Sequence, residues 1–360
     1  MNVRRVIQIA VAGGLFLVGI LNGSIMPQRA EAQVRDSRLA DSQQPGSVIV
    51  FPKFIRGFVP VDGTAIPQTE FEVGVVCPKG VVCPERQNVK IRFHYVCGTD
   101  EGAAADSFVC KETDFDAQVT VNGKLVFNPE AVTPPGNFIT PIPQCDRGYL
   151  IGWVINTSDQ PIKFDGLIGD AVIRESGTAV SAYNAIPIQA DPALASGALI
   201  TVGGGGGLVF DGQPGHYQAL TGVIFGDVAY DRVPNRFTNI TLLTLNVRSN
   251  RPNYPTFVDI NFYNQQEALL STATEFICWG ERRLSTQIDP NLTQSGMGSR
   301  KGVFITDAAE KVPIFGIADT AGAVTLLGLV ETLEGPTASE RQYTYGVFND
   351  SEVVTAIFRP

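Results

Sequence analysis

Six cysteines are the side chains of this 360-residue sequence best suited to covalent chemistry. None of them forms a Cys-x-x-Cys pair, the spacing typical of structural zinc sites. In a protein outside the cytosol, an even number of cysteines predicts disulfide bonds instead. The six positions are Cys77, Cys83, Cys97, Cys110, Cys145 and Cys278.

Local sequence predicts two disulfide pairings. Cys97 ends one strand-like run and Cys110 begins another, so a hairpin would bring their side chains together. Cys77 and Cys83 flank a turn-like insert, and a bridge between them would close a small loop. The remaining two cysteines are left either paired across domains or as buried thiols: Cys145 and Cys278.

The two histidines give little support for catalysis. His94 lies in the alternating run 89–95, on the face predicted to be polar, and is expected to be solvated. His216 lies in a turn at 212–217. A Ser-His-Asp or Cys-His site would need one of them, and the sequence has no Gly-x-Ser-x-Gly motif to supply a nucleophile. The chain is therefore not expected to be an enzyme of this type.

Two aspartates invite a comparison with the aspartic proteases. Asp170 and Asp319 occupy matching positions in two repeated segments, as do the paired carboxylates of the secreted enzymes. Those proteases use Asp-Thr-Gly or Asp-Ser-Gly, whereas this sequence has Asp-Ala-Val and Asp-Thr-Ala. Both aspartates are therefore predicted to accept hydrogen bonds in turns.

No cofactor is predicted, with calcium as the open alternative. The five glycines at 203–207 lack the Gly-Lys-Ser/Thr of a phosphate-binding loop and are predicted to form a flexible hairpin tip. Two pairs of aspartates could join loop carbonyls around calcium, although neither has the spacing of a known loop motif. These pairs are Asp114 with Asp116, and Asp227 with Asp231.

Exposed aromatic side chains could provide a flat platform for sugar rings. In a β protein at least half of them must lie in the core, and the sequence does not separate the two sets. The candidates are Trp153, Tyr183, Tyr217, Tyr230, Tyr254, Trp279, Tyr343 and Tyr345.

The sequence begins with the pattern of a cleavable export signal. Arg4 and Arg5 precede the uncharged apolar run 6–21, and a small-x-small site ends at Ala32. Cleavage is predicted between Ala32 and Gln33, with an uncleaved membrane anchor as the alternative. Residues 1–32 are thus assigned to the signal peptide, and the polar residues 33–46 to a flexible leader.

Composition limits the partners and the compartment. After the signal, no apolar run reaches the roughly 20 residues that a membrane-spanning helix needs. Cleavage removes three arginines and one glutamate, which changes the net charge from −9 to −11. This acidity argues against nucleic acid and anionic lipid as partners. The mature protein is predicted to be secreted or displayed on the cell surface, with the periplasm as an alternative.

Short alternating runs predict an all-β protein. Asn122-Gly123 is a strong hairpin signal between the runs 117–121 and 124–127. The 37 glycines and 23 prolines separate short apolar runs, and no long amphipathic helix pattern is present. The fold predicted from these features is antiparallel β-sandwich, either Ig-like or jelly-roll-like.

Three sequence blocks recur in the same order and predict an internal duplication. The blocks begin at residues 89, 106 and 148 in the first half, and at residues 258, 275 and 302 in the second half. Two related β-sandwich domains are therefore expected, at 47–232 and 233–360.

Four segments resemble a group of exported bacterial β-rich proteins of unknown function. These segments read SVIVFPK at 47–53, DSFVC at 106–110, FDGLIGD at 164–170 and FICW at 276–279. The resemblance extends over most of the mature chain and implies bacterial export and a β-rich fold, but no activity.

The sequence predicts an exported, non-catalytic protein with a structural, adhesive or binding role at the cell exterior. Its expected partners are other copies of the chain, cell-surface components or glycans. Strand addition would provide the contact, with 47–54 and 352–359 as the expected exposed edges. The alternative is a carbohydrate-binding module or a β-type glycoside hydrolase, which needs a cleft with aromatic walls.

Overall fold

The computed structural model describes ten segments of the chain, all of which belong to one compact unit, Ser37–Pro360. The protein is all-β, with 55% strand and 3% helix, and its sheets are antiparallel, as predicted. The predicted cleavage site between Ala32 and Gln33 lies outside the described residues. The described segments are 39–56, 69–84, 86–98, 109–129, 140–175, 179–248, 253–314, 317–334, 340–344 and 356–360.

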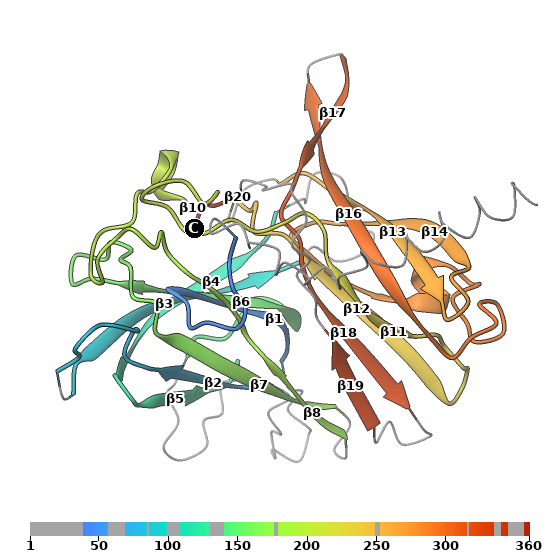
Figure 1. The fold of residues 1–360 in the computed structure, drawn as a ribbon, viewed down its shortest axis with the longest axis horizontal. Coiled ribbons are helices and arrows are strands. Elements are labelled where there is room, and N and C mark those ends of the chain that lie inside the picture. Colours follow the sequence, from blue (N-terminus) through green and yellow to red (C-terminus); the bar gives the residue numbers. More distant parts are fainter. Residues whose placement is uncertain are drawn as a thin grey trace, which may run out of the picture. The chain divides into compact units, whose positions relative to one another are not determined.

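Strands of the first half of the chain form two sheets (Figure 1). Sheet 1 has the order β4–β3–β6–β1–β9, and sheet 2 has the order β5–β2–β7–β8. The strands are β1 (Val48–Ile55), β2 (Thr69–Val75), β3 (Asn88–Cys97), β4 (Glu112–Thr120), β5 (Lys124–Phe127), β6 (Arg147–Ile155), β7 (Leu167–Glu175), β8 (Ala179–Asn184) and β9 (Ile186–Ile188).

Strands of the second half form two further sheets. Sheet 3 has the order β11–β16–β13–β14, with β17 paired to β16, and sheet 4 has the order β15–β12–β18–β19. A short sheet joins β10 to β20. The strands are β10 (Leu208–Phe210), β11 (Phe225–Ala229), β12 (Arg236–Leu243), β13 (Thr256–Asn264), β14 (Leu269–Phe276), β15 (Trp279–Arg283), β16 (Lys301–Ile314), β17 (Ile317–Ala323), β18 (Leu327–Glu334), β19 (Glu340–Thr344) and β20 (Ala356–Phe358).

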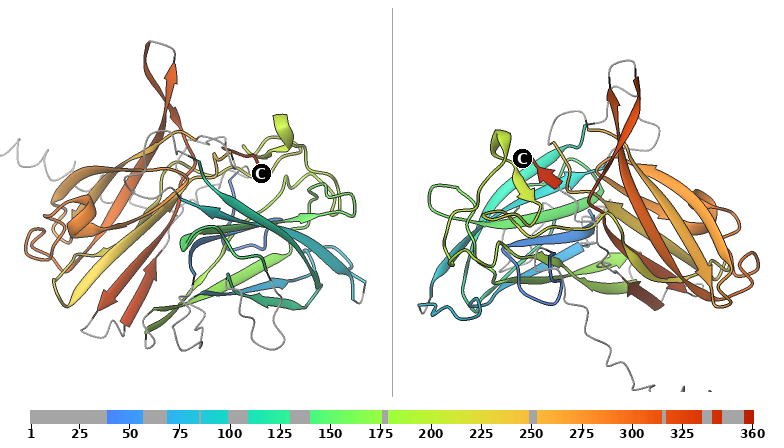
Figure 2. Two further views of the ribbon diagram at one scale, coloured as in Figure 1. Left: turned by 180° about the vertical axis from the view of Figure 1, so that it is seen from behind. Right: turned by 45° about the horizontal axis from the view of Figure 1, so that its top comes forward.

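The two halves repeat one order of strand pairing. In the first half the pairs are β1–β6, β3–β6, β3–β4, β2–β5, β2–β7 and β7–β8. The second half has the same pairs when β11 to β16 replace β1 to β6 in order, and β18 and β19 replace β7 and β8. β17 has no counterpart and extends from sheet 3 beside the end of β16 (Figures 1 and 2).

This repeated order agrees with two of the three predicted sequence matches. The runs 89–95 and 258–264 fall in the equivalent strands β3 and β13, and residues 148 and 302 begin the matching runs in β6 and β16. The later part of that third block does not match, because it falls in β7 in the first half and in β17 in the second. The remaining match differs, since 106–112 leads into β4 whereas 275–281 spans the corner between β14 and β15. Alternation alone does not separate a strand from the corner that follows it.

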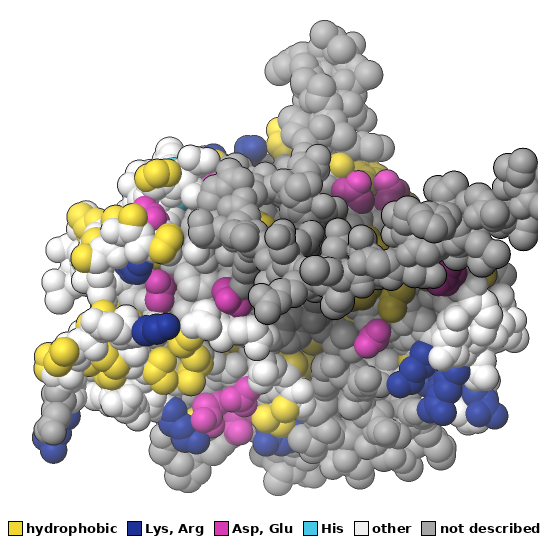
Figure 3. Space-filling view, viewed as in Figure 1, with side chains coloured by type: hydrophobic (Ala, Val, Ile, Leu, Met, Phe, Trp, Pro, Cys, Tyr) yellow, Lys and Arg dark blue, Asp and Glu magenta, His cyan; other side chains and the backbone are white. Residues whose placement is uncertain are grey.

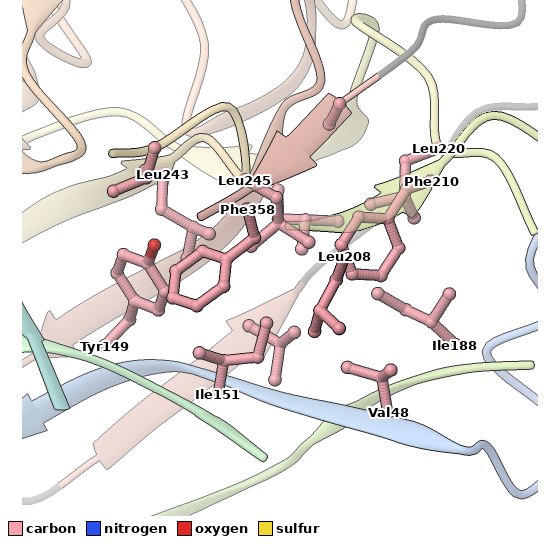
Figure 4. Close-up of a cluster of buried hydrophobic side chains, with 14 of the residues drawn as sticks. Val48, Tyr149, Ile151, Ile188, Leu208, Phe210, Leu220, Leu243, Leu245 and Phe358 are labelled. Atoms are coloured by element: carbon pink, nitrogen blue, oxygen red, sulfur yellow. The ribbon is translucent and has the colours of Figure 1, made fainter. Parts of the chain in front are cut away.

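Three clusters of buried apolar side chains hold the sheets. The first core lies between sheets 1 and 2 and includes Phe51, Phe71, Phe93 and Phe127. The second core lies between sheets 3 and 4 and includes Ile240, Val258, Phe262 and Phe304. The junction core contains side chains from sheet 1, the short sheet and the end of β12 (Figure 4). Its members include Val48, Tyr149, Ile151, Trp153, Leu208, Phe210, Leu243, Leu245 and Phe358.

β1, inside sheet 1, is covered on both faces. Along β1, Val48 and Val50 contribute to the junction core, whereas Ile49 and Phe51 contribute to the first core. All eight residues of β1 are buried, which is the pattern of a strand inside a doubly covered sheet. β1 also pairs with β6 on one side and with β9 on the other. The prediction that 47–54 forms an exposed edge is therefore wrong.

The Asn122-Gly123 turn forms, but it does not make a hairpin. Asn122 adopts a φ of 63°, and the Gly123 N–H donates to the Thr120 carbonyl at 2.8 Å. The strands on its two sides then separate, because β4 pairs with β3 in sheet 1 and β5 pairs with β2 in sheet 2. The turn carries the chain across the first core, and the buried side chain of Leu125 on β5 belongs to that core.

Strand pairing crosses the predicted domain boundary between residues 232 and 233. β11 lies before this boundary and pairs with β16, which lies after it. β20, at the other end of the chain, pairs with β10. The predicted limits 47–232 and 233–360 thus do not coincide with the limits of the sheets.

Three disulfides are present. Cys77 pairs with Cys83, as predicted, across a separation of 6 residues. The predicted Cys97–Cys110 bridge is wrong, because Cys97 pairs with Cys145. Cys110 pairs with Cys278 instead and connects two positions 168 residues apart. A hairpin argument considers local partners alone, whereas both of these bridges connect distant segments.

Candidate interaction surface

His94 is buried in the junction core rather than solvated, so its predicted exposure is wrong. Its side chain contacts the Glu112 carboxylate on β4, and its ring stacks on Trp153 with centroids 4.5 Å apart. Burial, together with the nearby charge of Arg92, lowers the pKa of His94 to about 3. The imidazole is therefore neutral at pH 7, and its position is fixed by packing within sheet 1.

His216 and Asp211 form a polar contact in the loop after β10. The His216 Nδ1 and Asp211 Oδ1 atoms are 2.8 Å apart, and the Asp211 carboxylate also accepts the Gln213 N–H at 2.9 Å. These bonds close a turn within a few residues of one another. Among the described residues, no serine hydroxyl or cysteine thiol is hydrogen-bonded to the ring of either histidine.

Asp170 and Asp319 are not equivalent, contrary to the sequence prediction. Asp170 lies on β7 of sheet 2, whereas Asp319 lies on β17, the strand without a counterpart. Burial raises the pKa of Asp170, and the neighbouring Glu72 carboxylate adds to the effect. The counterpart of β7 is β18, so the two aspartates belong to different strands of the repeated order.

Two of the aspartates predicted as calcium candidates, Asp116 and Asp231, bind other protein groups, whereas Asp114 and Asp227 are exposed. Asp116 accepts two hydrogen bonds from the guanidinium of Arg92, which holds the pKa of Asp116 below its ordinary value. Asp231 is buried and accepts hydrogen bonds from the Thr238 N–H and the Ser285 hydroxyl. In the part of the chain that the structure describes, no group of three or more His, Cys, Asp or Glu side chains is arranged to hold a metal.

Most of the aromatic candidates for a sugar platform are core residues. Tyr254 is half-buried, with the Arg248 guanidinium 5.5 Å from its ring centroid. The side chains of Tyr343 and Tyr345 lie outside the described part of the structure. The buried candidates are Trp153, Tyr183, Tyr217, Tyr230 and Trp279.

A buried ionic cluster, which the sequence analysis missed, connects sheet 1 to sheet 4. The Lys53 ammonium group on β1 bonds to the carboxylates of Glu281 on β15 and Glu331 on β18. The side chain of Lys53 is 0% exposed, and that of Glu331 is 1% exposed. The available sequence signal was a single charged residue inside the apolar run 48–55.

Further groups complete the environment of Glu281. Its second carboxylate oxygen accepts a bond from Arg147 on β6 at 2.5 Å. Burial alone would raise the pKa of Glu281, but the charges of Lys53 and Arg147 outweigh it, and the pKa lies below its ordinary value. The cluster is therefore a charged contact between elements of the two halves and not a reactive carboxyl pair.

β14 is the element best placed for contact with a partner. It is the last strand of sheet 3, and β13 is its one strand partner within the described residues. Its residues alternate, so that Leu270, Thr272 and Thr274 are half-buried while the residues between them are exposed. Eight residues with one charge, no proline and no glycine form a long, regular edge.

The hydrogen-bond pattern shows which backbone groups of β14 point outward. The Asn264 N–H donates to the Ala268 carbonyl, so this pair and every second pair along the hairpin are hydrogen-bonded. The groups of Leu269, Ser271, Ala273 and Glu275 therefore point away from β13. In agreement, the Glu275 carbonyl accepts a bond at 2.9 Å from Arg282, which belongs to sheet 4.

The outer face of sheet 3 continues this edge. Leu269 on β14 is 55% exposed and lies opposite the half-buried Tyr263 on β13. Ile305 on β16 is 36% exposed. Two exposed aspartates lie directly opposite each other on the same face, Asp259 on β13 and Asp307 on β16. The face thus combines exposed apolar side chains with a pair of like charges.

On the molecular face in Figure 3, basic side chains gather mainly at the lower right, and acidic side chains form several small groups. This face therefore has no broad surface of one sign. A search of the described residues for a helix long and apolar enough to cross a membrane finds none.

No model of a protein family matches the sequence, and no curated protein matches it.

Proposed function

We propose that this chain is an exported, non-catalytic protein with a structural, adhesive or binding role at the cell exterior. The observation that carries the proposal is the exposed, nearly uncharged edge of β14. Monomeric proteins usually protect such an edge with charges, prolines, bulges or covering loops. An edge without these protections is suited to adding a strand from another molecule.

The arrangement of the sheets supports a rigid body behind this edge. We infer that sheets 1 and 2 form one β-sandwich and that sheets 3 and 4 form a second, related one. The Cys110–Cys278 bridge and the Lys53 cluster both connect groups from the two halves of the chain. Disulfides of this kind are typical of proteins that work outside the cytosol.

The proposed partner at β14 is the β14 edge of a second copy. Antiparallel pairing through a two-fold axis perpendicular to the sheet would place Thr272 opposite Thr272 of the partner copy, and would keep every side chain on its present face. In that register Glu275 lies opposite the partner's Leu269, so the single charge of each strand avoids the other. A strand from a different cell-surface protein is the competing occupant.

Sedimentation velocity of the mature chain tests the proposal. Ala273→Lys places a charge on the edge and should weaken self-association by about tenfold or more, which corresponds to roughly 1.4 kcal/mol. Ala309→Lys places the same charge on the interior strand β16 of the same sheet and should leave association unchanged. Ala273→Pro should act like Ala273→Lys, because the Ala273 N–H points away from β13.

The outcomes separate the parts of the proposal. Wild-type protein that remains monomeric at its solubility limit would contradict self-association through β14. Equal weakening by Ala273→Lys and Ala309→Lys would assign the contact to the face of sheet 3 and not to its edge. N-terminal sequencing of protein recovered outside the cells tests export, with Gln33 as the expected first residue.

A further inference from the structure

The last strand of the chain lies in a contact surface built from distant segments. β20 forms three residue pairs with β10, its one strand partner within the described residues. Ala356 and Phe358 are both 0% exposed and belong to the junction core. The final segment 356–360 thus contributes a fully buried aromatic ring, and Figures 1 and 2 show β20 beside β10.

Sheet 1 forms one wall of this surface. The Phe358 ring meets His94 edge-on, with centroids 5.9 Å apart, and lies 6.0 Å from the Trp153 ring. Figure 4 shows the ring within the same cluster as Tyr149 and Leu208. The bound strand therefore fills space among side chains from β3, β6 and β10.

The glycine run forms a second wall, a role beyond the flexible tip that the sequence suggested. A Cβ atom on Gly207 would come within 2.8 Å of the Ile357 side chain and within 3.0 Å of the Phe358 carbonyl. Gly207 has an ordinary extended conformation, so its backbone angles do not require glycine. Glycine is required here because β20 lies too close to leave room for a Cβ atom. Bonds from Arg359 to the carbonyls of Val247 and Gly204 hold the end of the strand.

The walls of this surface are joined to each other without β20. The Gln218 N–H donates to the carbonyl of Gln189, which directly follows β9 of sheet 1. β10 is held by the Tyr217 N–H, which donates to the Val209 carbonyl. Removal of β20 would therefore empty a surface whose two walls are still joined by backbone hydrogen bonds.

The chain before β20 is long enough for its strand to reach another molecule. Eleven residues separate Thr344, the end of β19, from Ala356. A fully extended segment of that length spans roughly 40 Å. Every copy of the chain carries both the surface and the strand that fits it.

We propose that this acceptor surface, made by β10, Gly207 and the His94–Trp153 wall, binds β20 of a second copy in place of its own. Exchange of the C-terminal strand then links chains through contacts identical to those within one chain. The inference is independent of the proposed function, because it involves neither β14 nor export.

A mixture of two variants of the full chain, each with one added cysteine, tests this exchange. Val209 and Ile357 lie directly opposite each other, and the Val209 carbonyl points toward Tyr217 and away from β20. The pair is therefore of the closely spaced, non-hydrogen-bonded kind, which suits a disulfide. Val209→Cys and Ile357→Cys chains, mixed and oxidised, should give a covalent heterodimer. Peptide mass mapping should find its intermolecular disulfide between positions 209 and 357.

Two controls define the result. The double variant Val209→Cys with Ile357→Cys should form the disulfide between positions 209 and 357 within one chain and stay monomeric. This result would establish that the geometry permits that disulfide. A mixture of Ile357→Cys with Leu199→Cys measures chance collisions, because Leu199 is 53% exposed and not opposite Ile357. Exchange predicts a heterodimer yield several-fold above this background, both for native mixtures and after unfolding and refolding with the native disulfides intact.

A heterodimer yield no higher than the Leu199→Cys background after co-refolding, with the double variant closing normally, would overturn the proposal. Gly207→Val in the Val209→Cys chain supplies a second measurement, since the added side chain would occupy the space of Ile357. The heterodimer should then be lost while near-ultraviolet circular dichroism reports whether that chain remains folded. An undiminished yield with Gly207→Val would also contradict the assigned surface.

Discussion

Sheets 1 and 3 share a strand order but differ in what covers them. In sheet 1 the strands β6 and β1 are buried on both faces, by the first core and by the junction core, and charged side chains of β3 and β4 are partly exposed. In sheet 3 the equivalent order β14–β13–β16–β11 contributes to the second core on one face, and exposed side chains lie on the other. The same topology can therefore serve as an interior element or as a surface, depending on what packs against it.

The equivalent edge strands β4 and β14 differ in the same way. β4 carries Asp116, which pairs with Arg92 and Lys90 of the neighbouring strand β3. β14 carries Glu275 as its single charge. Charges on an edge discourage pairing with other molecules, so the edge of sheet 1 is protected in a way that the edge of sheet 3 is not.

The largest effect is expected from Lys53→Met within sheet 1. The substitution would remove the ammonium group that lies between the carboxylates of Glu281 and Glu331. Loss of one partner from a buried ionic group costs about 3–5 kcal/mol of unfolding free energy. Unfolding in urea, followed by tryptophan fluorescence, measures the change.

A matched substitution on an exposed pair provides the control for Lys53. Lys124→Met removes the exposed Lys124–Glu72 ion pair on the outer face of sheet 2 and should cost far less stability than Lys53→Met. Adding Glu281→Gln and Glu331→Gln to Lys53→Met should recover part of the lost stability. If Lys53→Met destabilised the protein no more than Lys124→Met, the contrast between buried and exposed faces would not hold.

His94→Phe should change the acid sensitivity of folding. The pKa of His94 is lowered to about 3 in the folded chain, below its ordinary value of 6.5. Between these values the unfolded chain binds a proton that the folded chain does not, so stability rises with pH, by at most about 1.4 kcal/mol per pH unit from this group. Above pH 6.5 this dependence ends.

Phenylalanine keeps a ring against Trp153 but cannot bind the proton, so its variant should show a shallower rise in stability between pH 3 and 6.5. Urea unfolding of both proteins at several pH values in this range gives the two slopes. Identical slopes would mean that His94 takes up its proton equally well in the folded chain, which its burial against Trp153 and Phe358 opposes.

The smallest effect is expected on the outer face of sheet 3. Asp307→Asn would relieve the repulsion between Asp307 and Asp259 and should stabilise the fold by about 0.2–1 kcal/mol. Asp227→Asn is the control, because the neighbour of Asp227 across the strands is Val303. The gain should shrink as salt is added. A gain from both substitutions alike would point to net charge and not to the facing pair.

The alternation of apolar and polar residues predicted individual strands well, but it predicted poorly which elements cover their faces. It located β3 and β13 and the repeat that relates them, because every strand has a period of two. It placed His94 in solvent because it assumes that a polar residue marks an uncovered face. The cover on that face comes from Phe358, at the far end of the chain, and a local pattern contains no information about so distant a contact.

The same limit explains the outcome for the cysteines. Cys77 and Cys83 are close in sequence, and local turn chemistry was enough to pair them. Cys110 and Cys278 meet because two similar halves of the chain pack through the junction core, and their pairing follows only once that arrangement is known. The edge at β14 likewise depends on which strand ends a sheet, a property of topology and not of composition.

The Cys110–Cys278 bridge also determines how the chain would respond to mechanical tension. Once the strand pairs that span the bridge have been pulled apart, such as β1 with β6 and β20 with β10, tension between the two ends would pass across the bridge and not along the chain between these cysteines. That stretch contains β4 to β14 and contributes strands to all four large sheets. Because the Cys97–Cys145 bridge stays closed, the stretch released by reduction runs from Cys145 to Cys278, a separation of 133 residues (278 − 145) or roughly 440–480 Å of extended chain. Reduction of one bond would therefore release a length of tether far greater than the folded protein itself.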